Sequence, residues 1–70
     1  MRYPKLRGKI REVFGTQEAF AIAMGMHKTT LVKKLAGKSE WTLGEVQKAA
    51  GLLGIPRDRI SEYFFAEQVA

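Results

Sequence analysis

The chain has 70 residues, a mass of 7.9 kDa, no cysteine, one histidine and a formal net charge of +5. A chain this short forms one domain of roughly 11 Å radius of gyration, too small for a buried substrate pocket beside its core. The lack of cysteine excludes disulfides, thiolate nucleophiles and thiolate metal sites, and one histidine cannot build a histidine cluster. No apolar stretch is long enough for a membrane span, and no signal peptide is visible. We therefore expect a small intracellular binding protein that is not an enzyme, needs no metal or cofactor and has no membrane partner.

The positive charge is concentrated in the first half of the chain. Residues 1–38 contain nine Lys and Arg against two Glu, a net charge of +7, whereas residues 39–70 have a net charge of −2. Such asymmetry is expected when one side of a domain meets a polyanion. A solvated basic face that keeps the protein soluble explains the charge equally well.

Apolar residues recur at helical spacing, and no segment has the alternation of a strand. A first helix runs from Pro4, which suits a first turn, to Gly15, which suits an end. Thr16 is the expected N-cap of a second helix that stops at Gly25. A third helix then continues to about Ala36.

A loop over residues 38–41 precedes the last two helices. Thr42 and Glu45 form a capping box at the start of a fourth helix, which ends at Gly54, and Pro56 lies in the first turn of a fifth. The apolar residues expected to face the core are Leu6, Ile10, Val13 and Phe14 in the first helix, Phe20, Ala21 and Met24 in the second, Leu31 and Leu35 in the third, Leu43, Val46, Ala50 and Leu53 in the fourth, and Ile60, Tyr63 and Phe64 in the fifth. The sequence thus predicts one all-α domain over residues 1–70, built from five short helices.

Residues 17–36 have the organisation of a helix-turn-helix. A turn centred on Gly25 joins two helices, and Leu31 follows that glycine by six residues. Ala21 is small, which lets the third helix cross closely above the second, and Gly25 tolerates a positive φ. The wedge between the two helices is expected to be filled by Phe20, Met26 and Leu31.

The chain resembles the helix-turn-helix of phage Cro and repressor proteins, the Xre-type family, in the residues Thr16-Gln17-Glu18, Phe20-Ala21, Gly25-Met26-His27-Lys28-Thr29-Thr30-Leu31 and Leu35-Ala36-Gly37-Lys38. The resemblance covers roughly residues 5–55, and the ending Ile60-Ser61-Glu62-Tyr63-Phe64-Phe65 makes the full length similar to small Cro-like proteins of phages and prophages. It implies a compact five-helix, lambda-repressor-like DNA-binding domain. Two positions depart from the family pattern: His27 stands where a small N-cap is usual, and Lys34 stands where the late apolar residue usually falls.

Helical geometry assigns the outward face of the third helix. With Leu31 in the core and 100° per residue, Thr29, Lys33 and Ala36 point outward, between Thr30 and Val32. In a major-groove docking the N-terminal residues of this helix meet base edges, where Lys donates to guanine and Val contacts a thymine methyl. The predicted base contacts are Lys28, Thr29, Val32 and Lys33. Lys34 lies toward the side of the helix, where a phosphate and solvent are equally suitable neighbours.

Phosphate contacts are expected at helix ends and loops. Gln17 opens the second helix, whose positive end favours an anion, and the resemblance implies that this glutamine binds phosphate. The other predicted phosphate contacts are His27, Thr30, Lys38, Ser39, Thr42, Arg7 and Arg11. For Arg7 and Arg11 plain solvation is the alternative, and for His27 a role as helix cap.

A single unit of this size buries little DNA, so we expect a homodimer on palindromic sites with half-sites roughly 34 Å apart. The candidate dimer residues, mostly in the segment 60–70, are Leu52, Tyr63, Phe65 and Val69. The alternative is that Phe65 and Val69 pack on their own core.

The function expected from these features is that of a Cro-like transcriptional repressor. It would bind double-stranded DNA in the cytoplasm of a bacterial host, associated with the nucleoid. The alternative is an interaction module of the same fold, such as an antitoxin or antirepressor, which binds a protein partner.

Overall fold

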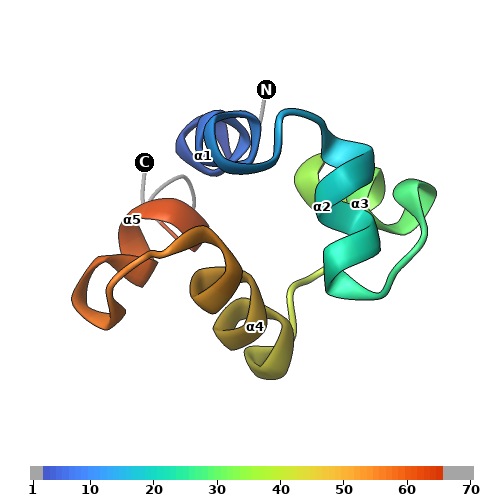
Figure 1. The fold of residues 1–70 in the computed structure, drawn as a ribbon. Helices are drawn as coiled ribbons and strands as arrows, with labels where there is room; N and C mark the ends of the chain where they lie inside the picture. Colours follow the sequence, from blue (N-terminus) through green and yellow to red (C-terminus); the bar gives the residue numbers. More distant parts are fainter. Residues whose placement is uncertain (1–2, 66–70) are drawn as a thin grey trace.

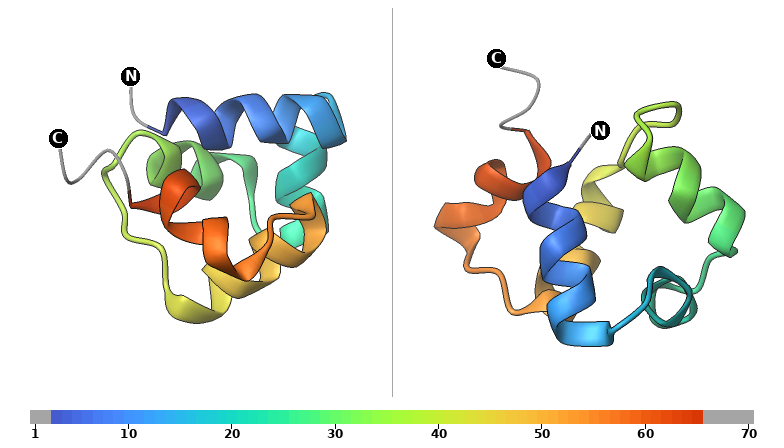
Figure 2. Two further views of the ribbon diagram at one scale, coloured as in Figure 1. Left: turned by 90° about the vertical axis from the view of Figure 1, so that its left-hand side faces the viewer. Right: turned by 90° about the horizontal axis from the view of Figure 1, so that it is seen from above.

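The computed structural model describes residues 3–65, and over these residues it contains helices and no strand. The elements are α1 (Pro4–Phe14), α2 (Gln17–Met24), α3 (Lys28–Leu35), α4 (Leu43–Leu53), the 3-10 turn η1 (Arg57–Arg59) and α5 (Ile60–Phe64). The α1 helix packs against α2, α4 and α5, while α2 also packs against α3 and α4. Figures 1 and 2 show α2 and α3 together at one end of the molecule and α5 at the other. The predicted all-α fold of five helices is confirmed, and the radius of gyration is 10.9 Å.

The predicted start of the second and fourth helices is confirmed by their capping bonds. The Ala19 N–H donates to Thr16 Oγ1 at 3.1 Å. In the capping box of α4, the Glu45 N–H donates to Thr42 Oγ1 at 3.1 Å, and the Thr42 N–H donates to Glu45 Oε1 at 2.9 Å. These bonds satisfy N–H groups that a helix end leaves without intrahelical partners.

The turn between α2 and α3 closes as a Schellman motif. Gly25 has φ of 76°, and its N–H donates to the Ile22 carbonyl while the Met26 N–H donates to the Ala21 carbonyl, both at 3.0 Å. Ala21 is buried, as the close crossing of the two helices requires. The glycine conformation and the small residue predicted from the sequence are therefore both present.

The start of the fifth helix differs from the prediction. Pro56 is extended and precedes the 3-10 turn η1, and the α-helix begins at Ile60. The Arg59 N–H donates to the Pro56 carbonyl in an i→i+3 bond of 2.9 Å. Because Ile55 is buried and Ile60 packs against the same core, the chain reverses within a few residues, and the tighter 3-10 turn permits this.

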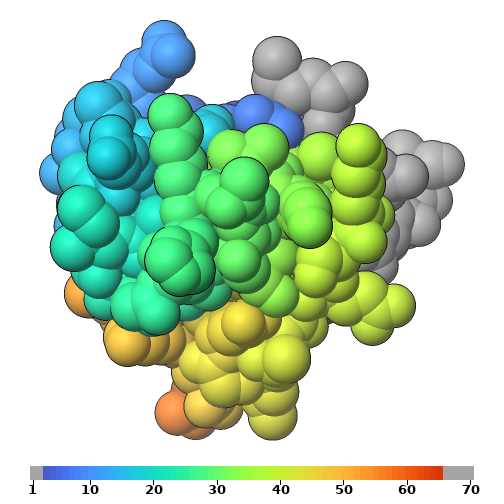
Figure 3. Space-filling model, turned by 90° about the vertical axis from the view of Figure 1, so that its right-hand side faces the viewer, coloured from blue at the N-terminus to red at the C-terminus, as the bar shows by residue number. Residues whose placement is uncertain are grey.

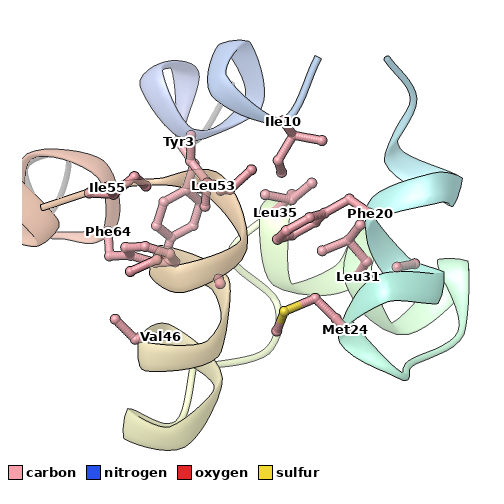
Figure 4. Packing of buried hydrophobic residues seen from close by; sticks show 14 residues of the cluster. Tyr3, Ile10, Phe20, Met24, Leu31, Leu35, Val46, Leu53, Ile55 and Phe64 are labelled. Carbon is pink, nitrogen blue, oxygen red and sulfur yellow. The ribbon is translucent and has the colours of Figure 1, made fainter. Parts of the chain in front are cut away.

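The core lies between all five helices (Figure 4). Its largest fully buried side chains are Phe20, Phe64, Leu6, Ile10, Leu31 and Leu35, all of which were predicted to face the core. Tyr3 is also buried, although no helical pattern marks it, because it directly precedes α1 and packs in the same cluster.

Two residues predicted to face the core are exposed instead. Val13 is 46% exposed because the core face of α1 follows Leu6 and Ile10, which leaves Val13 on its flank. Leu43 is 74% exposed because it opens α4, whose inward face is carried by residues from Val46 onward. The first turn of α4 extends beyond the other helices at the bottom of Figure 1.

Candidate nucleic-acid interface

The outer face of α3 forms part of the molecular surface, at the centre of the view in Figure 3. Lys28, Thr29, Val32 and Lys33 are all exposed, whereas Leu31 is fully buried and fixes the rotation of the helix. Ala36 and Thr30 are exposed as well, so the outward orientation predicted for Thr29, Lys33 and Ala36, with Thr30 and Val32 beside them, is confirmed. Contact with bases stays a prediction. We define the α2–α3 surface as Lys28, Thr29, Val32 and Lys33 together with Gln17 at the start of α2.

A basic hollow adjoins this surface between α1 and the N-terminus of α2. It has a volume of about 600 Å³, and its lining includes Arg7, Arg11, Gln17, Glu18 and Lys28. Lys28, a predicted base contact, thus lies beside three residues predicted to contact phosphate, Arg7, Arg11 and Gln17. The three cationic side chains and the positive end of α2 favour an anion here, and the Glu18 carboxylate opposes it.

Arg7 has a structural contact that its sequence position did not indicate. The guanidinium is half-buried, and its Nη2 donates to the Leu35 carbonyl at 3.0 Å. This bond ties α1 to the last turn of α3, where a cation also complements the helix dipole. Arg11, one turn further along α1, is exposed.

The remaining predicted phosphate contacts lie around the two ends of α3. His27 is exposed at the N-cap position of α3. Its side chain makes no capping hydrogen bond, so His27 does not act as the side-chain cap that was the alternative prediction. Thr30 is exposed on the helix itself. Lys38 is exposed and Ser39 is half-buried in the connection from α3 to α4, and the Thr42 hydroxyl accepts the α4 capping bond.

Lys34 departs from the prediction of a phosphate or solvent neighbour. Among residues 3–65 it is the buried charged side chain, at 5% exposure. Its Nζ donates to the Glu40 carbonyl at 2.8 Å, lies 2.9 Å from Glu45 Oε1 and is 5.8 Å from the centre of the Trp41 ring. The helix turns Lys34 toward the chain that returns to α4, where its long stem carries the ammonium group to these partners.

The same contacts act on Glu45. The Thr42 backbone N–H, and after it the Lys34 ammonium, lower the pKa of the Glu45 carboxyl below its ordinary value, against the opposing effect of burial. The carboxylate is therefore the form that the folded state favours. We call Lys34, Glu40, Trp41 and Glu45 the Lys34 cluster.

An apolar hollow of about 530 Å³ lies between α2 and α3, and the sequence did not indicate it. Ala21, Ile22, Met26 and Val32 contribute its apolar lining, and the rest is lined by Glu18, His27, Lys28 and Thr29. Ile22 is 73% exposed and Val32 is 43% exposed. The available signal was that Ile22 falls outside the predicted core face of its helix.

Among the predicted dimer residues that the structure describes, Phe65 is exposed and the other two are half-buried. Leu52 and Tyr63 are half-buried and pack against the core of their own chain. Phe65 is 45% exposed, with its ring centre 6.5 Å from that of Phe64. Val69 lies outside the described residues. Dimer formation therefore stays a prediction.

Membrane spans and metal sites were both considered for the described part of the chain. No helix between residues 3 and 65 is long and apolar enough to cross a membrane. The same span has no group of three or more His, Asp or Glu side chains arranged to hold a metal ion.

The sequence and the fold were compared with those of known proteins. Residues 1–67 match the family described as "Protein of unknown function (DUF739)". The fold is similar to the solution structure of the modulator of repression (MOR) of the temperate bacteriophage TP901-1 from Lactococcus lactis, with a TM-score of 0.81 and 44% sequence identity. That match covers 91% of this chain and 86% of the other. No curated protein sequence matches the chain.

Proposed function

The chain belongs to the DUF739 family, and we propose that it is a phage or prophage regulator that binds duplex DNA through the α2–α3 surface. The observation that carries this proposal is the exposure of Thr29 and Lys33 on the face of α3 opposite the buried Leu31, with Lys28 exposed in the first turn of the same helix. A basic, polar outer face on a rigidly packed helix is what direct readout of base edges requires.

The dimensions of α3 are consistent with major-groove binding. A helix with its side chains is about 10–12 Å across, which fits a major groove about 12 Å wide, and the eight residues of α3 provide about 12 Å of helix along it. Lys28 lies at the leading end and Lys33 one and a half turns later, so both ammonium groups are available to guanine acceptors. Gln17 and Arg11 flank the helix at the basic hollow, where they are available to backbone phosphates.

The likeness to a modulator of repression supports a place in a repression circuit. We propose that the protein acts in the bacterial cytoplasm by occupying operator DNA on the nucleoid. Two copies would bind half-sites about one helical turn apart, which supplies the affinity that one small domain lacks.

The second candidate function is binding to another protein of the same circuit, such as the repressor itself. The apolar hollow favours it, because Ile22 and Val32 offer aliphatic surface that DNA can use only at thymine methyl groups. The similar phage protein is named for modulating repression, a description that fits an antirepressor as well as an operator-binding protein.

Selection from randomised duplex DNA at two salt concentrations tests the first candidate. Enrichment of an inverted repeat is the expected result, with an affinity that falls as salt rises. Unselective, salt-sensitive binding would contradict sequence-specific regulation.

A matched pair of variants separates the two candidates. In a reporter strain that carries the phage repressor and its operator, Lys33→Ala should weaken the effect of a DNA-binding regulator, and Ile22→Ser should leave it unchanged. The reverse pattern would favour binding to a protein partner. Both positions are exposed, so neither change should unfold the domain.

A further inference from the structure

We propose that Lys34 is a positioning residue for DNA binding, which holds the α3–α4 connection (residues 36–42) so that Lys38 and Ser39 face the same duplex as α3. This role of Lys34 rests on the proposed DNA-binding function, although the Lys34 side chain itself touches no DNA. Lys34 is withdrawn from any external anion because it is 5% exposed.

The α3–α4 connection begins as a Schellman motif. The Gly37 N–H donates to the Lys34 carbonyl at 3.1 Å, and the Lys38 N–H donates to the Lys33 carbonyl at 2.9 Å. Gly37 has φ of 81°, which reverses the chain direction after the helix. These bonds fix residues 37 and 38 relative to α3 but make no contact with α4.

The Lys34 cluster supplies the missing attachment to α4. The Lys34 ammonium donates to the Glu40 carbonyl, and the Glu45 Oε1 atom that it pairs with also accepts from the Thr42 N–H. One side chain of α3 therefore holds the far end of the connection and the first turn of α4 together. Lys38 lies at the first of these fixed points, and Ser39 lies between the two.

The charges around α3 support a positioning role for Lys34 and a phosphate-binding role for its exposed neighbours. Lys33 and Lys38 are exposed cations near the C-terminal end of the helix, and Lys34 lies between them in sequence. Because Glu45 neutralises Lys34 internally, its charge is not available to a phosphate. Loss of a phosphate-binding residue lowers the slope of log binding constant against log salt concentration by about one for each phosphate that the protein no longer neutralises. Loss of the Lys34 charge itself should not lower this slope directly, because that charge neutralises no phosphate.

The test compares Lys34→Met, which keeps the length of the side chain and removes its charge, with Lys38→Ala and the double variant. Trp41 is the single tryptophan, so its emission reports on the Lys34 cluster. We expect each single variant to weaken binding to the selected duplex about three- to tenfold, and the double variant to bind no more weakly than the weaker of the two single variants. Base preference should not change. Lys48→Met, a lysine whose Nζ reaches the Met24 carbonyl at 3.3 Å, is the matched control and should bind normally.

Additive losses in the double variant would mean that Lys34 contacts DNA itself, and unchanged affinity in Lys34→Met would mean that it positions nothing. Either result overturns the proposal. If Lys34→Met unfolds, Glu45→Gln breaks the same ion pair while glutamine keeps the capping bond. It should then reproduce the loss of affinity.

Hydrogen exchange separates this proposal from the proposed function. Faster exchange of the Thr42 amide in Lys34→Met, with no duplex bound by the wild-type protein, would show that the attachment exists and that DNA binding is what failed. Unchanged exchange at this amide would overturn the positioning role itself.

Discussion

Leu31→Ala gives the sharpest test of how the fold presents α3, because the adjacent residue provides its control. Leu31 is fully buried between α2 and α3, while Val32 is 43% exposed on the same helix. The change removes three buried carbon atoms, which at about 0.8 kcal/mol each gives about 2.4 kcal/mol of lost transfer free energy. The cavity left behind brings the expected loss to about 3–4 kcal/mol.

A domain of 70 residues has a free energy of unfolding of about 3.5–10 kcal/mol, so this one change removes a third or more of it. Thermal unfolding followed by circular dichroism should show Tm falling by more than about 10 °C. Val32→Ala should change the free energy of unfolding by less than about 0.5 kcal/mol. Equal effects of the two variants would refute the packing of α3 described above.

Three further predictions concern DNA contact, pH and the turn. Lys33→Ala should cost about 1–3 kcal/mol and relax preference at one base pair, whereas Gln17→Ala should weaken all sequences alike; selection with each variant checks this, and uniform effects of both would contradict the placement of α3. Because the pKa of Glu45 is lowered in the folded state, its ionised form stabilises the protein above the ordinary glutamate pKa of about 4.3, and this stability is lost as pH falls through the folded pKa. Urea unfolding should therefore show Glu45→Gln less stable than wild type at pH 7, with the difference shrinking as the pH falls below the ordinary glutamate pKa, while Glu12→Gln, in a solvated pair, should match wild type throughout. A constant difference for Glu45→Gln would be inconsistent with this linkage. Gly25→Ala should destabilise by about 1 kcal/mol in thermal unfolding because φ is 76°, while the added Cβ would meet only Lys48 Nζ, at 3.9 Å; an unchanged or raised Tm would argue against that conformation.

Local chemistry in the sequence was enough to predict the ends of most helices. Thr16, Thr42 and Gly25 each act on atoms within a few residues of themselves, so their roles do not depend on the rest of the fold. The outward face of α3 was likewise predictable, because the rotation of one helix about a buried Leu31 is a local property.

Where the sequence did not predict the surroundings of a side chain, those surroundings are set by residues far away in the chain. Periodicity does not show which flank of the apolar face of α1 the core leaves uncovered, as at Val13, or where along α4 the packing begins, as at Leu43. The burial of Lys34 needs Glu45 from the next helix, and Arg7 bonds to Leu35, 28 residues away. These contacts are set by tertiary packing, which helical spacing does not encode.

The most direct test of DNA binding through the α2–α3 surface is a titration of ¹⁵N-labelled protein with the selected duplex. The account predicts that the backbone amide signals of Gln17, Lys28, Thr29 and Lys33 shift most, with smaller changes at Lys38. Shifts confined to α4 and α5, or none at any duplex concentration, would contradict it.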